Sequence, residues 1–218
     1  SNNKLTTLPK SIGQLTALKE LNLEKNGIQS PPKNIGLLTA LEKLNFKYNQ
    51  LTSLPDSIGQ LTSLNEFNLN DNWLKSIPDS IGQLTGLKEL PLSHNRLKSI
   101  PDSIGRLTEL KELDLAFNCL ETLPDSIGRL SSLEKLKLNS NRFTIIPEVL
   151  WQLTALKELN LNHNKLRSVP DSIGLLSELR NLRLSYNYFR SVPDSIGLLT
   201  SLTSLNLYDN RLVRLPAS

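Results

Sequence analysis

The sequence predicts an α/β solenoid: a stack of repeated units with a parallel β-sheet on its concave face and short helices or 3₁₀ turns on its convex face. Prolines recur every 23 residues from Pro9 to Pro216, asparagines recur every 23 residues from Asn26 to Asn210, and no insertion disturbs either series. A fixed period of about 20–50 residues is typical of solenoids, whose units bury their apolar faces only by stacking. We therefore expect one domain over residues 1–218, with nine 23-residue repeats and partial units at both ends.

The strands are expected just before each recurring asparagine. A representative segment, Leu156 to Asn164, has leucines at its first, fourth and sixth positions and ends on the asparagine. Its central apolar and polar residues alternate as in a strand with one buried face. One such strand per repeat would build the sheet.

The convex side is expected after each proline. The segment Pro55–Leu64 begins with the proline, has the capping-box spacing from Ser57 to Gln60, and then places apolar residues three apart. This pattern predicts a short helix or 3₁₀ turn capped by Ser57. In the seventh repeat Trp151 replaces the usual glycine and Val149 the usual serine, which predicts a local irregularity.

The recurring asparagines are expected to have a structural role. An amide side chain both donates and accepts hydrogen bonds, so it can satisfy backbone groups where the chain leaves a strand. The glycine after the isoleucine, as at Gly82, is interpreted as a packing position.

The nine in-register LxxLxLxxN segments, within the longer unit LPDSIGQLTSLxxLxLxxN, resemble the leucine-rich-repeat superfamily. The unit is similar to a 23-residue subclass found in Ras-pathway scaffolds and in bacterial proteins, including spirochaetal ones. The resemblance covers essentially the whole chain and implies a right-handed horseshoe arc. It implies a macromolecular partner, without naming one, because function lies in sites that differ between members of a fold.

The charge distribution argues against a nucleic-acid partner. The net charge is +4, but acidic residues follow the prolines and basic residues follow the asparagines, so we expect two parallel rows that neutralise each other. The acidic row is Asp56, Asp79, Asp102, Asp125, Glu148, Asp171 and Asp194, and the basic row includes Lys75, Arg96, Lys98, Arg142, Lys165, Arg167, Arg190 and Arg211. A nucleic-acid binder would show a stripe of one sign with stacking aromatic residues.

Candidate binding residues come from three columns that packing leaves free to vary, and Tyr208 lies near one edge of this surface. We predict that the concave face offers an acidic groove edged by aromatic rings to a protein partner with a basic surface. The predicted partner-binding residues are Tyr48, Glu66, Asp71, Glu89, His94, Glu112, Asp114, Phe117, His163, Tyr186 and Tyr208. The alternative interpretation is an ordinary solvated face with scattered aromatic residues.

Catalysis is not expected. Asp71 with His94, and Ser140 with His163, are each one period apart, but neither pair has a third group to orient the imidazole. The two histidines are three periods apart, too far to share a metal ion. No catalytic residue, metal site or cofactor is therefore predicted.

The single cysteine, Cys119, excludes an intramolecular disulfide, and no N-x-Ser/Thr sequon is present, which favours a bacterial or cytosolic origin. No apolar run could span a bilayer. Asn3 lies one period before Asn26, so we expect the chain to begin inside a repeat. The preferred hypothesis is a secreted or surface protein of a bacterium, a virulence factor that engages a host protein, and a monomer is expected. The alternatives are an intracellular signalling scaffold, a host-glycan-binding adhesin, or a consensus-designed array.

Overall fold

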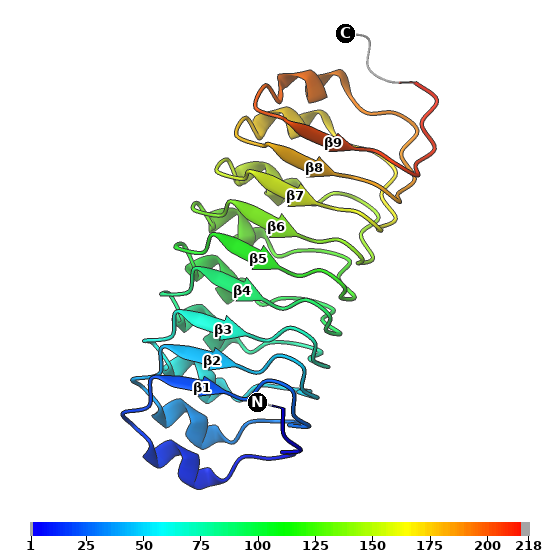
Figure 1. The fold of residues 1–218 in the computed structure, drawn as a ribbon. Coiled ribbons are helices and arrows are strands. Elements are labelled where there is room, and N and C mark those ends of the chain that lie inside the picture. Colours follow the sequence, from blue (N-terminus) through cyan, green and yellow to red (C-terminus); the bar gives the residue numbers. More distant parts are fainter. Residues whose placement is uncertain (1, 215–218) are drawn as a thin grey trace.

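The computed structural model describes residues 2–214 as an elongated stack, with the first and last repeats at opposite ends (Figure 1). Nine parallel strands lie in chain order in one open sheet, and a 3₁₀ turn precedes each strand and lies behind the sheet. The strands are β1 (Glu20–Asn22), β2 (Lys43–Asn45), β3 (Glu66–Asn68), β4 (Glu89–Pro91), β5 (Glu112–Asp114), β6 (Lys135–Lys137), β7 (Glu158–Asn160), β8 (Asn181–Arg183) and β9 (Ser204–Asn206). The predicted solenoid is confirmed.

Strands β2 to β8 each bury their middle residue and turn their first and third residues to the concave face, whereas the middle residues of the end strands, Leu21 and Leu205, are partly or largely exposed. In β5 and β6 the paired middle residues are Leu113 and Leu136, both fully buried. The pairing of β3 with β4 is reduced to Glu66 opposite Glu89. Pro91 explains this, because proline has no N–H to give to the sheet.

The convex side consists of nine 3₁₀ turns of five residues each within the described part of the chain. They are η1 (Lys10–Gln14), η2 (Lys33–Leu37), η3 (Asp56–Gln60), η4 (Asp79–Gln83), η5 (Asp102–Arg106), η6 (Asp125–Arg129), η7 (Glu148–Gln152), η8 (Asp171–Leu175) and η9 (Asp194–Leu198). The predicted capping box is wrong. Pro55 itself is the N-cap of η3, and the hydroxyl of Ser57, inside the turn, donates instead to the carbonyl of Lys33 at 2.6 Å.

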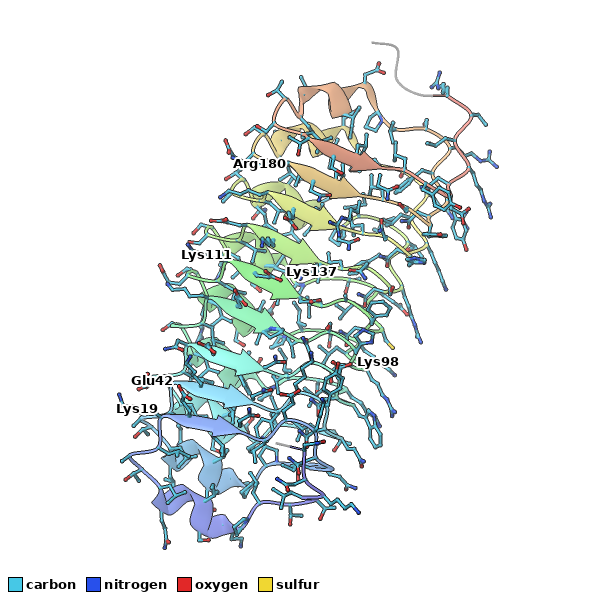
Figure 2. All side chains as sticks on the ribbon, in the orientation of Figure 1. Lys19, Glu42, Lys98, Lys111, Lys137 and Arg180 are labelled. Atoms are coloured by element: carbon cyan, nitrogen blue, oxygen red, sulfur yellow. The ribbon has the colours of Figure 1, made fainter. Side chains whose placement is uncertain are left out.

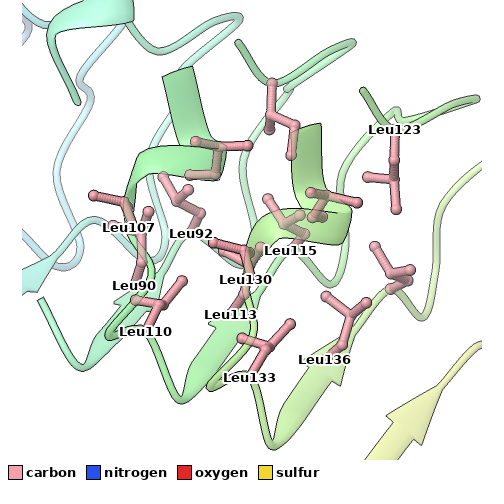
Figure 3. Packing of buried hydrophobic residues seen from close by; sticks show 14 of the residues in the cluster. Leu90, Leu92, Leu107, Leu110, Leu113, Leu115, Leu123, Leu130, Leu133 and Leu136 are labelled. Atoms are coloured by element: carbon pink, nitrogen blue, oxygen red, sulfur yellow. The ribbon is translucent and has the colours of Figure 1, made fainter. Parts of the chain in front are cut away.

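The core is a continuous column of leucines between the sheet and the turns. Figure 3 shows Leu90, Leu113 and Leu136 from three neighbouring strands packed with Leu107 and Leu130 from the convex side. All five side chains are at most 1% exposed. Replacing one buried leucine of this kind with alanine typically costs about 2–5 kcal/mol.

The recurring asparagines form a buried ladder along the stack, as predicted. The amide nitrogen of Asn95 donates to the carbonyls of Leu69 at 2.9 Å and Leu92 at 3.1 Å, and its oxygen accepts from the N–H of Leu74 at 3.0 Å. One side chain thus satisfies backbone groups of two repeats where the chain leaves the strand, at sites closed to water.

The turn glycines allow neighbouring turns to approach each other. A Cβ added at Gly82 would collide with the carbonyl oxygen of Ser103 in the next repeat. Trp151 occupies the same position in η7, where its buried indole donates to Glu148 at 3.0 Å. The turn keeps its five residues, but η7 packs less extensively on η8 than most neighbouring turns do. The irregularity is therefore one of packing between turns.

Candidate functional site

Nine of the variable positions lie in the loops that follow the strands, and we call them the bend column. Each is the residue before a ladder asparagine, three residues beyond the strand end, and so lies at the carboxyl edge of the sheet rather than on a strand (Figure 1). The bend column is Lys25, Tyr48, Asp71, His94, Phe117, Ser140, His163, Tyr186 and Asp209.

All nine residues have left-handed backbone, with φ between 49° and 57°. This conformation costs a residue with a Cβ about 1–2 kcal/mol, and glycine adopts it without that cost. The column nevertheless contains no glycine, and Tyr48, His94, Phe117, His163 and Tyr186 carry rings there. The backbone conformation, which favours glycine, therefore does not explain why these positions carry large side chains.

The rings of the bend column stack between repeats. His94 lies against Phe117 and His163 against Tyr186, each with centroids 4.1 Å apart and planes within 11° of parallel. Tyr208, one residue before the column, meets Tyr186 edge-on at 5.4 Å. Phe117 and Tyr186 still expose 47% and 41% of their surface, so each stack leaves an aromatic surface for a partner.

Basic side chains contact the other exposed rings of this edge. The Lys47 ammonium lies 4.7 Å from the ring centre of Tyr48, and the Arg96 guanidinium 5.0 Å from that of Trp73. A hollow of about 400 Å³ lies around Asp71, Trp73, His94, Arg96 and Phe117. The structure thus brings together Asp71, His94 and Phe117 of the predicted site, together with Arg96, whose part the sequence reasoning missed.

The predicted acidic groove is largely neutralised by lysines. Lys43 pairs with Glu66 at 2.7 Å, and Lys137 reaches Glu112 at 2.6 Å and Asp114 at 3.6 Å. Within residues 2–214, Glu89 is the one predicted strand carboxylate without an ion pair. The sheet over β2 to β4 is hollowed by about 700 Å³, and its lining carries both signs of charge.

Lys137 and Tyr186 are among the groups of the site whose pKa values are shifted. Burial acts to lower the pKa of Lys137, but its hydrogen bond to Glu112 and the charge of Asp114 outweigh burial and raise the pKa above 10.5. Burial, together with nearby Tyr208 and Asp209, raises the pKa of Tyr186. Lys137 lies on the open face of the sheet (Figure 2) and keeps its charge there.

The acidic and basic rows are not joined by ion pairs. Of the ion pairs in the described chain, none links a carboxylate after a proline to a basic residue after an asparagine. The basic row projects at the carboxyl edge, where Lys98 marks it in Figure 2. Its last members, Arg167, Arg190 and Arg211, line a groove of about 630 Å³ with Tyr188.

The two histidines considered for catalysis stack on aromatic rings of the next repeat. Within residues 2–214, no hydrogen bond joins Asp71 to His94 or Ser140 to His163; each imidazole instead stacks on the next ring of the column. No group of three or more His, Cys, Asp or Glu side chains in that range could hold a metal ion. Cys119 is a partly exposed free thiol.

No helix in the described part of the chain is long and apolar enough to cross a membrane.

Three family models match the sequence. A leucine-rich-repeat region model matches residues 67–170, and two leucine-rich-repeat models match residues 154–212 and 40–61. No curated protein matches the chain.

Solved structures with the same fold come from bacteria and plants. A Leptospira interrogans leucine-rich-repeat protein is 36% identical over 98% of this chain, with a TM-score of 0.82. The ectodomain of an Arabidopsis thaliana membrane receptor kinase, in complex with Casparian strip integrity factor 2, is 30% identical over 96% of this chain (TM-score 0.60). A Listeria monocytogenes internalin, 22% identical over 95% of this chain (TM-score 0.73), shares the fold. The chain spans 60%, 31% and 66% of these proteins, respectively.

Proposed function

We propose, taking as premise that the chain is a leucine-rich-repeat protein, that it is a binding module that holds a protein partner along the carboxyl edge of its concave face. Proteins of this family are generally non-catalytic interaction modules. The proposed contact surface is formed by the rings of the bend column and Tyr208, together with the outward residues of the neighbouring strands.

The observation that carries this proposal is the set of half-exposed rings on left-handed backbone. Aromatic residues are enriched among the side chains that dominate protein interfaces. Here two stacked pairs, His94 with Phe117 and His163 with Tyr186, are fixed in orientation before any partner arrives. A surface that is ordered in advance loses less conformational entropy on binding.

The mixed charge of the strands changes the proposed partner. Because lysines pair with Glu66, Glu112 and Asp114, the strands favour a partner of mixed charge. A basic partner residue would find Glu89 free, between these pairs. The aromatic edge, rather than net charge, is proposed to supply most of the affinity.

We further propose a bacterial protein, secreted or at the cell surface, that engages a host protein. The support is the likeness to the Leptospira protein over 98% of this chain. The likeness to a Listeria internalin supports only a shared fold. An intracellular scaffold would use the same concave geometry. The identity of the captured partner therefore decides between a secreted or surface protein and an intracellular scaffold.

The test compares two triple variants of the same column. The ring variant changes Tyr48, Phe117 and Tyr186 to alanine. The control variant changes Lys25, Ser140 and Asp209 to alanine, so both variants place three alanines on left-handed backbone of the same column. The chain and both variants are immobilised, and capture from host membrane extract, host cytosol and bacterial lysate is compared after circular dichroism has verified the fold.

We expect the ring variant to lose at least about tenfold in apparent affinity and the control less than about threefold, since interface aromatics contribute most strongly. Equal capture by the folded ring variant and the unaltered chain would refute the aromatic edge as the binding surface. Capture only from host cytosol or bacterial lysate would refute the host-surface role.

A further inference from the structure

The groove of Arg167, Tyr188, Arg190 and Arg211 is a second surface, separate from the bend column. It lies where the chain leaves β7, β8 and β9 and heads for the convex side, one and three residues after a ladder asparagine. Its volume of about 630 Å³ exceeds that of the hollow around Trp73. Its lining within residues 2–214 contains no acidic side chain.

The three guanidinium groups have no acidic partner within the described chain. None of the ion pairs between residues 2 and 214 includes Arg167, Arg190 or Arg211. The Arg211 guanidinium lies 4.5 Å from the ring centre of Tyr188, a contact that orients it and leaves its N–H donors unused by any carboxylate. Like charges brought together without a counterion are expected to attract an anion.

The backbone holds these side chains at fixed intervals. The N–H of Tyr188 donates to Leu166 at 2.8 Å, and the N–H of Arg211 donates to Phe189 at 2.9 Å, so each loop is bonded to the one before it. Arg167 and Arg190 occupy equivalent positions of neighbouring repeats, so their backbones lie about 4.8 Å apart, the spacing of neighbouring strands. Arg211 is equivalent to Tyr188 and lies in the next repeat, two positions earlier along its loop, so the three cations are staggered over two repeat spacings. An extended peptide places alternate side chains about 6.6 Å apart, so two or three carboxylates of one segment fit this span.

The row is too short for a long polyanion. Arg142 and Lys165 extend the row of cations into the sixth and seventh repeats, but Cys119 and Glu121 occupy both equivalent positions of the fifth repeat and interrupt it there. Tyr188, the one aromatic ring in the groove, already has Arg211 over it, whereas a single-stranded nucleic acid needs several ring faces on which to stack its bases. A guanidinium group, by contrast, fits a carboxylate with two parallel hydrogen bonds.

We propose that this arginine groove docks an acidic, extended segment of a protein partner, with its carboxylates held by Arg167, Arg190 and Arg211. The site stands independently of the proposed aromatic edge, because it shares no residue with the bend column. Its position beside Tyr186 and Tyr208 would let one partner occupy both surfaces.

The experiment uses a fluorescein-labelled decapeptide of alternating Glu and Ser, with fluorescence anisotropy as the readout at about 0.15 M salt, where charges are screened beyond about 8 Å. The chain is compared with R167Q/R190Q/R211Q and with K75Q/K98Q/R142Q. The control removes the same three charges from exposed positions of the same edge. A third variant, R167K/R190K/R211K, keeps the positive charges but removes the guanidinium groups that can each make two parallel hydrogen bonds to a carboxylate.

We expect the glutamine variant of the groove to bind the peptide at least about tenfold more weakly, the control to change by less than about threefold, and the lysine variant to weaken by at least about threefold. Equal weakening in the groove and control variants would overturn the proposal in favour of diffuse charge attraction. Full binding by the lysine variant would overturn the guanidinium assignment.

Two further outcomes would also overturn it: no binding of the peptide to the unaltered chain, or tighter binding of a ten-nucleotide oligothymidylate that is lost in the groove variant. The free peptide probe separates this result from that of the aromatic edge, since changing Tyr48, Phe117 and Tyr186 is expected to leave peptide affinity within about threefold.

Discussion

The imidazole of His94 lies parallel to the phenyl ring of Phe117, 4.1 Å away, although the backbone of both residues is left-handed. A stacked aromatic pair contributes about 0.5–1.5 kcal/mol beyond burial, and left-handed backbone costs about 1–2 kcal/mol at each residue. The two effects are of similar size and opposite sign. Substitutions that remove one without the other can therefore separate them.

Phe117→Ala removes the stack and keeps the backbone cost, so we expect a loss of about 1 kcal/mol in the free energy of unfolding. Phe117→Gly removes both and is expected to be nearly neutral. Ser140→Gly, which has no ring contact to lose, should stabilise by about 1 kcal/mol. Urea unfolding measures all three, and a glycine variant at Phe117 less stable than the alanine variant would contradict this account.

The asparagine ladder predicts a large stability effect at a buried position. Asn95→Ala leaves the N–H of Leu74 and the carbonyls of Leu69 and Leu92 without the amide, so we expect a loss of about 3 kcal/mol or more. Asn68→Ala is the control, because that side chain accepts only the N–H of Asn70, and about 1 kcal/mol is expected. Equal losses in urea unfolding would refute the ladder's role.

The turn glycines predict opposite effects at a central and at a terminal position of one column. A Cβ at Gly82 meets backbone of Ser103, so Gly82→Ala is expected to cost about 1–3 kcal/mol. A Cβ at Gly197 meets nothing within 4 Å, and alanine there restricts the unfolded chain, so Gly197→Ala should stabilise by about 0.4–1 kcal/mol. Thermal unfolding tests the pair, and a fall in Tm for both would show that close approach is not the cause.

The ion pair of Lys137 predicts a stability difference that depends on pH. Its folded pKa is raised above 10.5 by Glu112 and Asp114 despite burial, so its contribution is complete below that pH and is lost as the pH rises through the folded value. With screening by solvent, Lys137→Gln is expected to cost about 0.5–1 kcal/mol at pH 7 and less above pH 10.5.

Lys111→Gln is the matched control for Lys137, since Lys111 is exposed and makes no ion pair within the described chain (Figure 2). Urea unfolding between pH 7 and 11 gives the difference from the unaltered chain at each pH. A difference for Lys137→Gln that grows with alkaline pH would have the wrong sign for this ion pair.

The fold was predictable from the sequence because each recurring residue has one physical task. The leucines fill the core, the ladder asparagines satisfy loop backbone, and Gly82 lets turns approach; all three tasks repeat every 23 residues. The capping role of Ser57 was predicted wrongly because a serine two residues after a proline is compatible with either a cap or a bond to the preceding repeat.

The candidate site was less predictable because it depends on side chains that differ between repeats. The lysine partners of Glu66 and Glu112 were present in the sequence one period away, at Lys43 and Lys135, and reading each column for alternating charge would have found them. The arginine groove has a similar signal in Arg167 and Arg190. The left-handed backbone of the bend column had no signal in the sequence, because the column contains no glycine.

The uninterrupted 23-residue period gives the molecule the properties of a ruler. His94 and His163 are 69 residues apart, three repeats, so the two stacked pairs stand about 14 Å apart by strand spacing. Excising 23 consecutive residues between them would shorten that separation by one strand spacing, about 4.8 Å, and leave every remaining repeat with a matching neighbour. Partner length could thus be measured against the protein, one repeat at a time.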